Sequence, residues 1–168
     1  MFHQHWAIFI ELIRVPFRHM DLVWGIVPLY FGWMLNELTS SKASFKTATQ
    51  TGFGFLWAGA HWMYQYFSTR PPGAPKWDVN MLFAVNVLVT VFVLAIGLVA
   101  LISGLFHRYP KYGSFLGYTR FSNYFMIMIF PMQSNYLTWT WERLVAILIF
   151  AVPIWLALQF GFMPLRKK

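Results

Sequence analysis

Residues 79–106 decide the fold class of this chain, with the sequence VNMLFAVNVLVTVFVLAIGLVALISGLF. No charged side chain interrupts them, and at about 1.5 Å per residue they extend roughly 42 Å as a helix. Because the hydrocarbon core of a bilayer is about 30 Å thick, this helix is long enough to cross a membrane and must tilt or protrude. We therefore expect a transmembrane helix here and interpret the other segments around it.

The composition of the whole chain favours the same class. Hydrophobic residues make up 58% of the 168 residues and charged residues only 11%, whereas soluble domains carry about 25% charged residues. Aromatic side chains stand at the ends of apolar runs, where the headgroup region of a bilayer favours them, as at Trp24, Trp77, Trp139 and Trp141. The sequence therefore predicts an all-α integral membrane protein.

Five apolar segments within residues 21–168 are expected to cross the bilayer and form one helical bundle. Whether the fourth segment crosses the membrane is undecided, because its purely apolar core is short and Arg120 precedes it. The alternative is an interfacial or re-entrant helix. Five spans place five Lys and Arg on one side and eight on the other, whereas four spans give seven and six. The positive-inside bias favours a five-span, multi-pass protein with a cytoplasmic C-terminus. The approximate spans are 21–38, 47–68, 79–106, 113–133 and 144–163.

Residues 1–20 are predicted to form an amphipathic helix that lies in the membrane interface. Apolar side chains such as Trp6 and Phe9 share one helical stripe, and Glu11, Arg14 and Arg18 lie on the opposite side. A contact with a partner helix is the alternative interpretation.

The second and third spans each carry a stripe of small and polar side chains. Because small residues allow close helix packing in a bilayer, we expect the two stripes to meet. His61 precedes Ser68 by seven residues and Asn86 follows Val79 by seven, so both lie at about the same depth. We expect a His61–Asn86 hydrogen bond, or alternatively a polar pocket or proton path. The stripes are Thr51, Gly54, Ala58, His61 and Gln65, and Asn86, Thr90, Val93, Gly97, Ala100 and Gly104.

Other polar residues are expected near the two membrane surfaces. Arg120 either pairs with Glu37 or binds lipid phosphate. His19, Asp21 and His61 are candidate metal ligands, but no spacing resembles an established zinc, copper or di-iron site. His107 ends the third span at the opposite surface from His61, so a bis-His haem is not expected. Neither a metal nor a haem is therefore predicted, and lipid is the expected ligand. His3 and His5 are further weak candidates as metal ligands, and Asp78 is a further candidate near the membrane surface.

Several function classes are excluded by the sequence. Zero Cys removes thiolate catalysis, iron–sulfur clusters and Cys-based zinc sites, and no nucleophile elbow, GxGxxG or P-loop motif occurs. The 13 Lys and Arg are scattered among the connections, which indicates anionic lipid headgroups rather than nucleic acid as the counter-charge.

The leading hypothesis is a non-catalytic membrane subunit: a scaffold, assembly or stabilising component of a larger complex, with other membrane subunits as partners. The alternative is a small channel or transporter, as a homo-oligomer, that conducts along Thr51, His61, Gln65 and Asn86. The third hypothesis is a metal- or haem-binding membrane protein.

Overall fold

The computed structural model describes residues 2–39, 45–68, 81–106 and 119–161, and over these ranges the chain is helical, with no strand. The predicted all-α class is thereby confirmed. The helices are α1 (Phe2–Arg18), α2 (Met20–Thr39), α3 (Phe45–Ser68), α4 (Met81–Phe106), α6 (Thr119–Gln133) and α7 (Trp141–Gly161).

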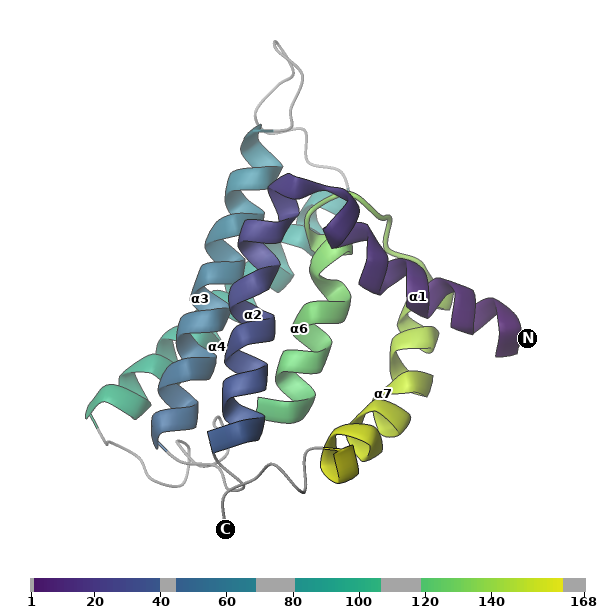
Figure 1. Ribbon diagram of the computed structural model, residues 1–168. Coiled ribbons are helices and arrows are strands. Elements are labelled where there is room, and N and C mark those ends of the chain that lie inside the picture. Colours follow the sequence, from purple (N-terminus) through teal and green to yellow (C-terminus); the bar gives the residue numbers. More distant parts are fainter. Residues whose placement is uncertain (1, 40–44, 69–80, 107–118, 162–168) are drawn as a thin grey trace.

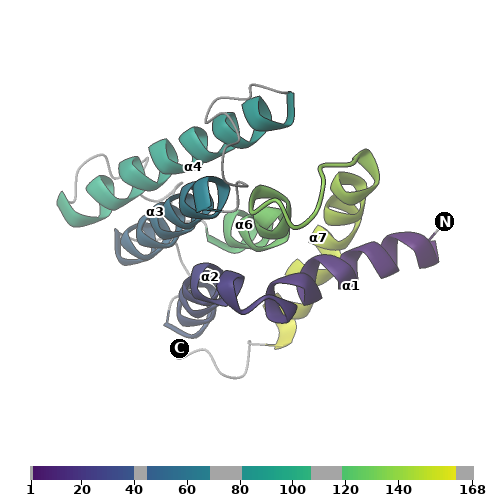
Figure 2. The same ribbon diagram turned by 90° about the horizontal axis from the view of Figure 1, so that it is seen from above.

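Helix α6 lies at the centre of the fold, with α2 and α3 on one side and α7 on the other (Figures 1 and 2). Helix α4 packs on the outer side of α3, and α1 crosses one end of the bundle over α2, α6 and α7. The segment predicted as a fourth span, 113–133, therefore includes a core helix over Thr119–Gln133, whereas residues 113–118 lie outside the described residues.

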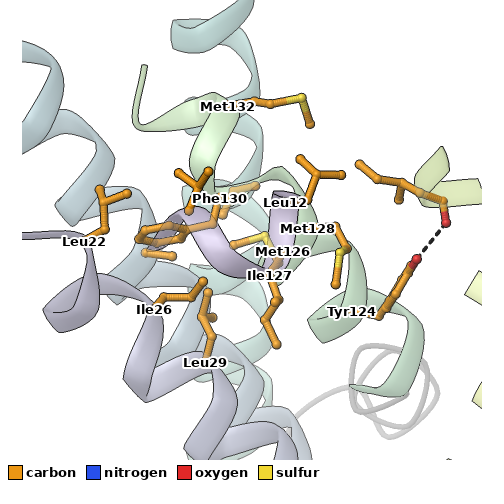
Figure 3. Packing of buried hydrophobic residues seen from close by; sticks show 14 of the residues in the cluster. Leu12, Leu22, Ile26, Leu29, Tyr124, Met126, Ile127, Met128, Phe130 and Met132 are labelled. Atoms are coloured by element: carbon orange, nitrogen blue, oxygen red, sulfur yellow. Dashed lines mark hydrogen bonds between the residues drawn. The ribbon is translucent and has the colours of Figure 1, made fainter. Parts of the chain in front are cut away.

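The hydrophobic core is built on α6, whose apolar side chains meet those of α1 and α2 (Figure 3). Met126, Ile127 and Phe130 are each at most 3% exposed. The hydroxyl of Tyr124 donates a hydrogen bond of 2.7 Å to the carbonyl oxygen of Ile147, which ties α6 to α7. The neighbouring helices contribute Leu12, Leu22, Ile26 and Leu29.

One side of α1 packs on the bundle while the rest of the helix is exposed. Phe9 and Leu12 are buried, and the ring of Phe9 lies 4.5 Å from that of Phe150 on α7. Trp6, predicted on the same apolar stripe as Phe9, is 45% exposed. Glu11 forms an ion pair of 3.5 Å with Arg143 at the start of α7. The ring of Trp6 also lies 5.4 Å from that of Phe150, so the bundle covers the apolar side of α1 only in part.

Helices α3 and α4 approach one another so closely that their backbones touch. A Cβ atom at Gly52 would lie 2.7 Å from the carbonyl oxygen of Gly97, and one at Gly104 would lie 2.8 Å from that of Phe45. Real Cβ atoms essentially never show contacts below 3.0 Å. Glycine is therefore required at both positions by the spacing of the two helices.

The stripe predicted on α4 is buried, but it meets a different face of α3 from the predicted one. Gly52 and Gly59 of α3 lie against α4. The predicted face of α3 turns instead toward α2 and α6: a Cβ at Gly54 would contact Leu29, and His61 stacks on Phe130. The expected meeting of the two predicted stripes is therefore wrong for α3, which carries small residues on two faces.

Among the described helices, one segment, Leu82–Phe106, is long and apolar enough to cross a membrane, judged by length and composition. Helix α2 contains a shorter apolar segment, Met20–Leu35. Polar residues within α3 and the shortness of α6 keep those helices below the same criterion. Membrane association through one helix is compatible with these findings, whereas the predicted five-span bundle is not confirmed.

Candidate functional site

The turn after α6 is the structural centre of the polar site. The N–H of Asn135 donates to the carbonyl oxygen of Met132 (3.2 Å), and the N–H of Tyr136 donates to that of Pro131 (3.1 Å). This pair of bonds is a Schellman motif, whose residue after the helix adopts the left-handed conformation. Asn135 has a φ of 60°, and asparagine tolerates this region better than other non-glycine residues. The motif ends α6 and directs the side chains of the turn toward its neighbours.

Asn86 of α4 forms hydrogen bonds with this turn and with the residues next to it. Its Nδ2 donates to Oδ1 of Asn135 at 2.8 Å, and its Oδ1 accepts from Nε1 of Trp139 at 2.8 Å. Its backbone oxygen accepts from Nε2 of Gln133 at 3.1 Å, and the same Nε2 lies 3.2 Å from Oγ1 of Thr90. Asn86 and Gln133 are at most 4% exposed. We call Asn86, Thr90, Gln133, Asn135 and Trp139 the Asn86 network; it joins α4 to the α6–α7 connection.

A second polar cluster surrounds Asp21 at the start of α2. The hydroxyl of Tyr136 donates a hydrogen bond to Oδ2 of Asp21, and the side chain of Gln65 from α3 also bonds to this carboxylate. The ring of His19 lies 4.3 Å from that of Tyr136. We call His19, Asp21, Gln65 and Tyr136 the Asp21 cluster. It connects α2, α3 and the α6–α7 connection at one end of the bundle.

The pKa of Tyr136 is raised to about 12 from its ordinary value of 10. Partial burial is the largest cause, followed by the hydrogen bond to Asp21 and the negative charge of that carboxylate. The phenol therefore stays protonated at neutral pH and acts as a hydrogen-bond donor, not as a base.

His61 does not bond to Asn86 as expected, because it faces α2 and α6 instead of α4. Its ring stacks on Phe130 at 5.6 Å, and a Cβ atom at Gly25 would lie 2.5 Å from its Cγ. Its Nε2 is buried and has no hydrogen-bond partner among the described residues. His61 thus fills the space that Gly25 leaves open.

The other predicted site residues do not gather into one centre. Thr51 is buried, and its hydroxyl donates to the carbonyl oxygen of Thr47 at 2.8 Å within α3. His3 is exposed near the N-terminus of α1, and His5 is half-buried on the same helix. Within the described ranges, no group of three or more His, Asp or Glu could hold a metal ion. Asp78 and the side chains of Glu37 and Arg120 lie outside what the structure describes.

Four residues of the two clusters are not predicted as site residues from the sequence: Gln133, Asn135, Tyr136 and Trp139. Their signal is the segment PMQSNYLTW, residues 131–139, in which an asparagine follows an apolar helix. Asparagine at such a position indicates a left-handed helix end. That signal locates the turn, although not the helix that it contacts.

The left-handed conformation of Asn135 leads to a testable expectation. Asn135→Ala should destabilise the protein by about 1 kcal/mol more than Asn135→Gly, because both remove the bond to Asn86 and only alanine is strained at this φ. The free energy of unfolding in detergent micelles measures the difference. Equal destabilisation by the two variants would argue against a strained backbone.

The Tyr136–Asp21 hydrogen bond should make stability depend on alkaline pH. Because the folded-state pKa of Tyr136 is raised, the bond stabilises fully below pH 10 and its contribution is lost as pH rises through about 12. Tyr136→Phe should therefore unfold at a lower temperature than the parent at neutral pH, and this difference should narrow as pH rises from 10 to about 12. Thermal unfolding of both proteins at neutral and at alkaline pH measures this difference. An unfolding-temperature difference that persists unchanged at high pH would contradict the role of the Tyr136–Asp21 hydrogen bond.

Both clusters consist mainly of neutral groups, most of which form hydrogen bonds within their cluster, and among the described residues neither contains a nucleophile beside a general base. Their chemistry is that of positioning: they fix the α6–α7 connection against α2, α3 and α4. Comparison of the chain with known proteins found no matching family model, no similar curated protein and no similar solved structure.

Proposed function

We propose that this chain is a non-catalytic integral membrane subunit that acts as a scaffold, assembly or stabilising component of a larger membrane complex. The observation that carries the proposal is the outer side of α4. Leu88, Val91, Phe92, Leu105 and Phe106 are each 58% exposed or more on this helix. Soluble monomers rarely expose a continuous apolar surface of this kind, so lipid or another subunit is its natural neighbour.

The other outer helices support a membrane location in the same way. Large apolar side chains are exposed on α2, α3 and α7, among them Phe31, Phe53, Tyr64, Leu148 and Val152. In a bilayer these side chains contact acyl chains at no cost, whereas in water each would remain unburied. We propose that α2, α3, α4 and α7 cross the membrane and that α6 is the fifth, buried member of the bundle.

Helix α1 fits the interface of this arrangement. Arg14 and Arg18 are exposed on its polar side, and Trp6 and Phe17 are exposed on its apolar side. Such a helix lies with its rings in the acyl boundary and its guanidinium groups at anionic headgroups. The five-span charge bias then places the C-terminus in the cytoplasm.

The hydrogen bonding of the buried polar side chains supports the non-catalytic part of the proposal. The amide of Asn86 uses its hydrogen bonds on Asn135 and Trp139, and Nε2 of Gln133 donates to the backbone oxygen of Asn86. Such pairing fixes helix positions and leaves little capacity for substrate chemistry. The free apolar surfaces on α1 and α4 supply the contact area that a subunit needs.

Native mass spectrometry of the chain extracted from its own membranes in mild detergent tests this function. We expect the protein to resist alkaline carbonate extraction and to travel with at least one different membrane protein. A monomer that travels alone would contradict the subunit role. A symmetric homo-oligomer whose flux in liposomes changes in His61→Ala would favour the channel alternative.

A further inference from the structure

The side of α1 that faces away from the bundle carries two arginines on adjacent turns (Figure 1). Arg14 and Arg18 are both exposed, and residues four positions apart are neighbours on a helix surface. They line a hollow of about 150 Å³ together with Ala7, Ile10 and Glu11. This volume is about ten times the roughly 10–15 Å³ that one water molecule requires, so a phosphate group has room there.

The two guanidinium groups are unpaired within the part of the chain that the structure describes. Like charges four residues apart on a helix repel one another. An anion placed between them replaces this repulsion with two charge-assisted hydrogen bonds. Because the planar guanidinium fork matches the spacing of phosphate oxygens, the pair is suited to a phosphate anion.

Glu11 lines the same hollow, and its carboxylate would repel a phosphate. That carboxylate forms the 3.5 Å ion pair with Arg143 at the start of α7. The guanidinium of Arg143 is held in place by Thr138, because it donates to the carbonyl oxygen of this residue at 2.5 Å and to its hydroxyl at 3.0 Å. The negative charge of Glu11 is thus offset by Arg143, and the hollow keeps the positive charge of Arg14 and Arg18.

Two aromatic rings are exposed beside these arginines on the same helix. Trp6 and Phe17 are 45% and 53% exposed. With 3.6 residues per turn, both rings fall along one edge of the outward side, next to Arg14. In a bilayer such rings enter the acyl boundary, while guanidinium groups stay at the level of the headgroups. A phospholipid offers both counterparts, a phosphate for the arginines and acyl chains for the rings.

We propose that Arg14 and Arg18 together hold the phosphate of one anionic phospholipid, whose acyl chains lie beside Trp6 and Phe17. A headgroup with its own cation, such as phosphocholine, would place that cation close to two arginines, so a lipid with a net negative charge is preferred. The inference rests on the membrane location in the proposed function, and it names the lipid that the interfacial helix binds.

Native mass spectrometry of the full chain in mild detergent tests the proposal, with phosphatidylglycerol and phosphatidylcholine of identical acyl chains as the added lipids. We expect the phosphatidylglycerol complex to form at about tenfold lower lipid concentration. Inorganic phosphate at the same concentration should not displace the lipid, because it has no acyl chains. Equal binding of the two lipids, or displacement by inorganic phosphate, would overturn the proposal.

Matched variants show whether one phosphate contacts both arginines. Either Arg14→Gln or Arg18→Gln should lose nearly the whole tenfold preference, whereas two independent charges would each account for about threefold. Lys46→Gln should keep the preference, because Lys46 is also an exposed cation but does not line the hollow. Threefold losses in the two arginine variants, or an equal loss in Lys46→Gln, would contradict a shared phosphate site. All three positions are exposed, so circular dichroism should show the fold of the parent.

Failure of this inference is distinguishable from failure of the proposed function. Carbonate extraction and the search for copurified subunits report on the membrane location and the subunit role, whereas lipid preference in detergent reports on α1 alone. A chain that stays in membranes with a partner but binds both lipids equally retains its proposed function and lacks the lipid site. If the double arginine variant loses a copurified subunit and keeps its preference for phosphatidylglycerol, the arginines bind that subunit and the lipid site is refuted.

Discussion

Gly52→Ala should destabilise the protein by about 3 kcal/mol, at the upper end of what overpacking costs. The added Cβ would lie 2.7 Å from the carbonyl oxygen of Gly97 and 2.8 Å from Cα of Leu101. Both are backbone atoms, which cannot rotate away as a flexible side chain does, so α3 and α4 must move apart. Because α4 packs mainly on α3, this separation weakens its principal attachment to the bundle. Denaturation of the detergent-solubilised protein, followed by circular dichroism, measures the loss.

Gly32→Ala is the matched control for this substitution. Gly32 also lies within a helix, but a Cβ there would meet nothing within 4 Å. Alanine is favoured over glycine in helices by about 1 kcal/mol, so this variant should be as stable as the parent or slightly more stable. If Gly52→Ala behaves like Gly32→Ala, the close approach of α3 and α4 is refuted.

The α3–α4 contact shows how much of the helix packing can be predicted from the sequence. Helical periodicity correctly predicts the buried side of α4, because Asn86, Thr90 and Ala100 stand out in a long aliphatic segment. The same reasoning fails for α3, which packs between α2 and α4 and carries small residues toward both. A stripe of small residues indicates close packing but does not identify the neighbour. Only the central position of α6, between α2, α3 and α7, settles which face meets which helix.

For the candidate site, the sequence likewise identifies some of the residues but not the contacts between them. Asn86 is recognisable as a polar residue within an apolar segment, and Asp21 as a charge at a helix start. The common depth of Asn86 and His61 predicts their pairing, yet depth does not fix the direction in which each side chain points around its helix. The true partners, Asn135 and Trp139, lie about 50 residues further along the chain, in a turn whose position depends on how α6 packs. Local sequence patterns carry no information on such a contact.

Asn86→Leu should destabilise the protein by about 2 kcal/mol. Leucine has the same branching at Cγ as asparagine, although it is larger, and it removes two hydrogen bonds of 2.8 Å, the one accepted from Trp139 and the one donated to Asn135. Each such bond contributes about 1 kcal/mol in soluble and membrane proteins. The indole N–H of Trp139 is then left unpaired, which adds to the cost. The α6–α7 connection also loses its side-chain anchor on α4, so proteolysis within residues 134–140 should become faster.

Thr90→Val is the control that separates the anchor from the rest of the network. It keeps the side-chain shape and removes only the contact between Oγ1 and Nε2 of Gln133, which still donates to the backbone oxygen of Asn86. We expect a loss well below 1 kcal/mol. The double variant Asn86→Leu with Trp139→Phe should be less destabilised than the sum of the single variants, because both remove the same bond. Strict additivity would mean that Asn86 and Trp139 do not act together, and the Asn86 network would then be reduced to its contact with Asn135.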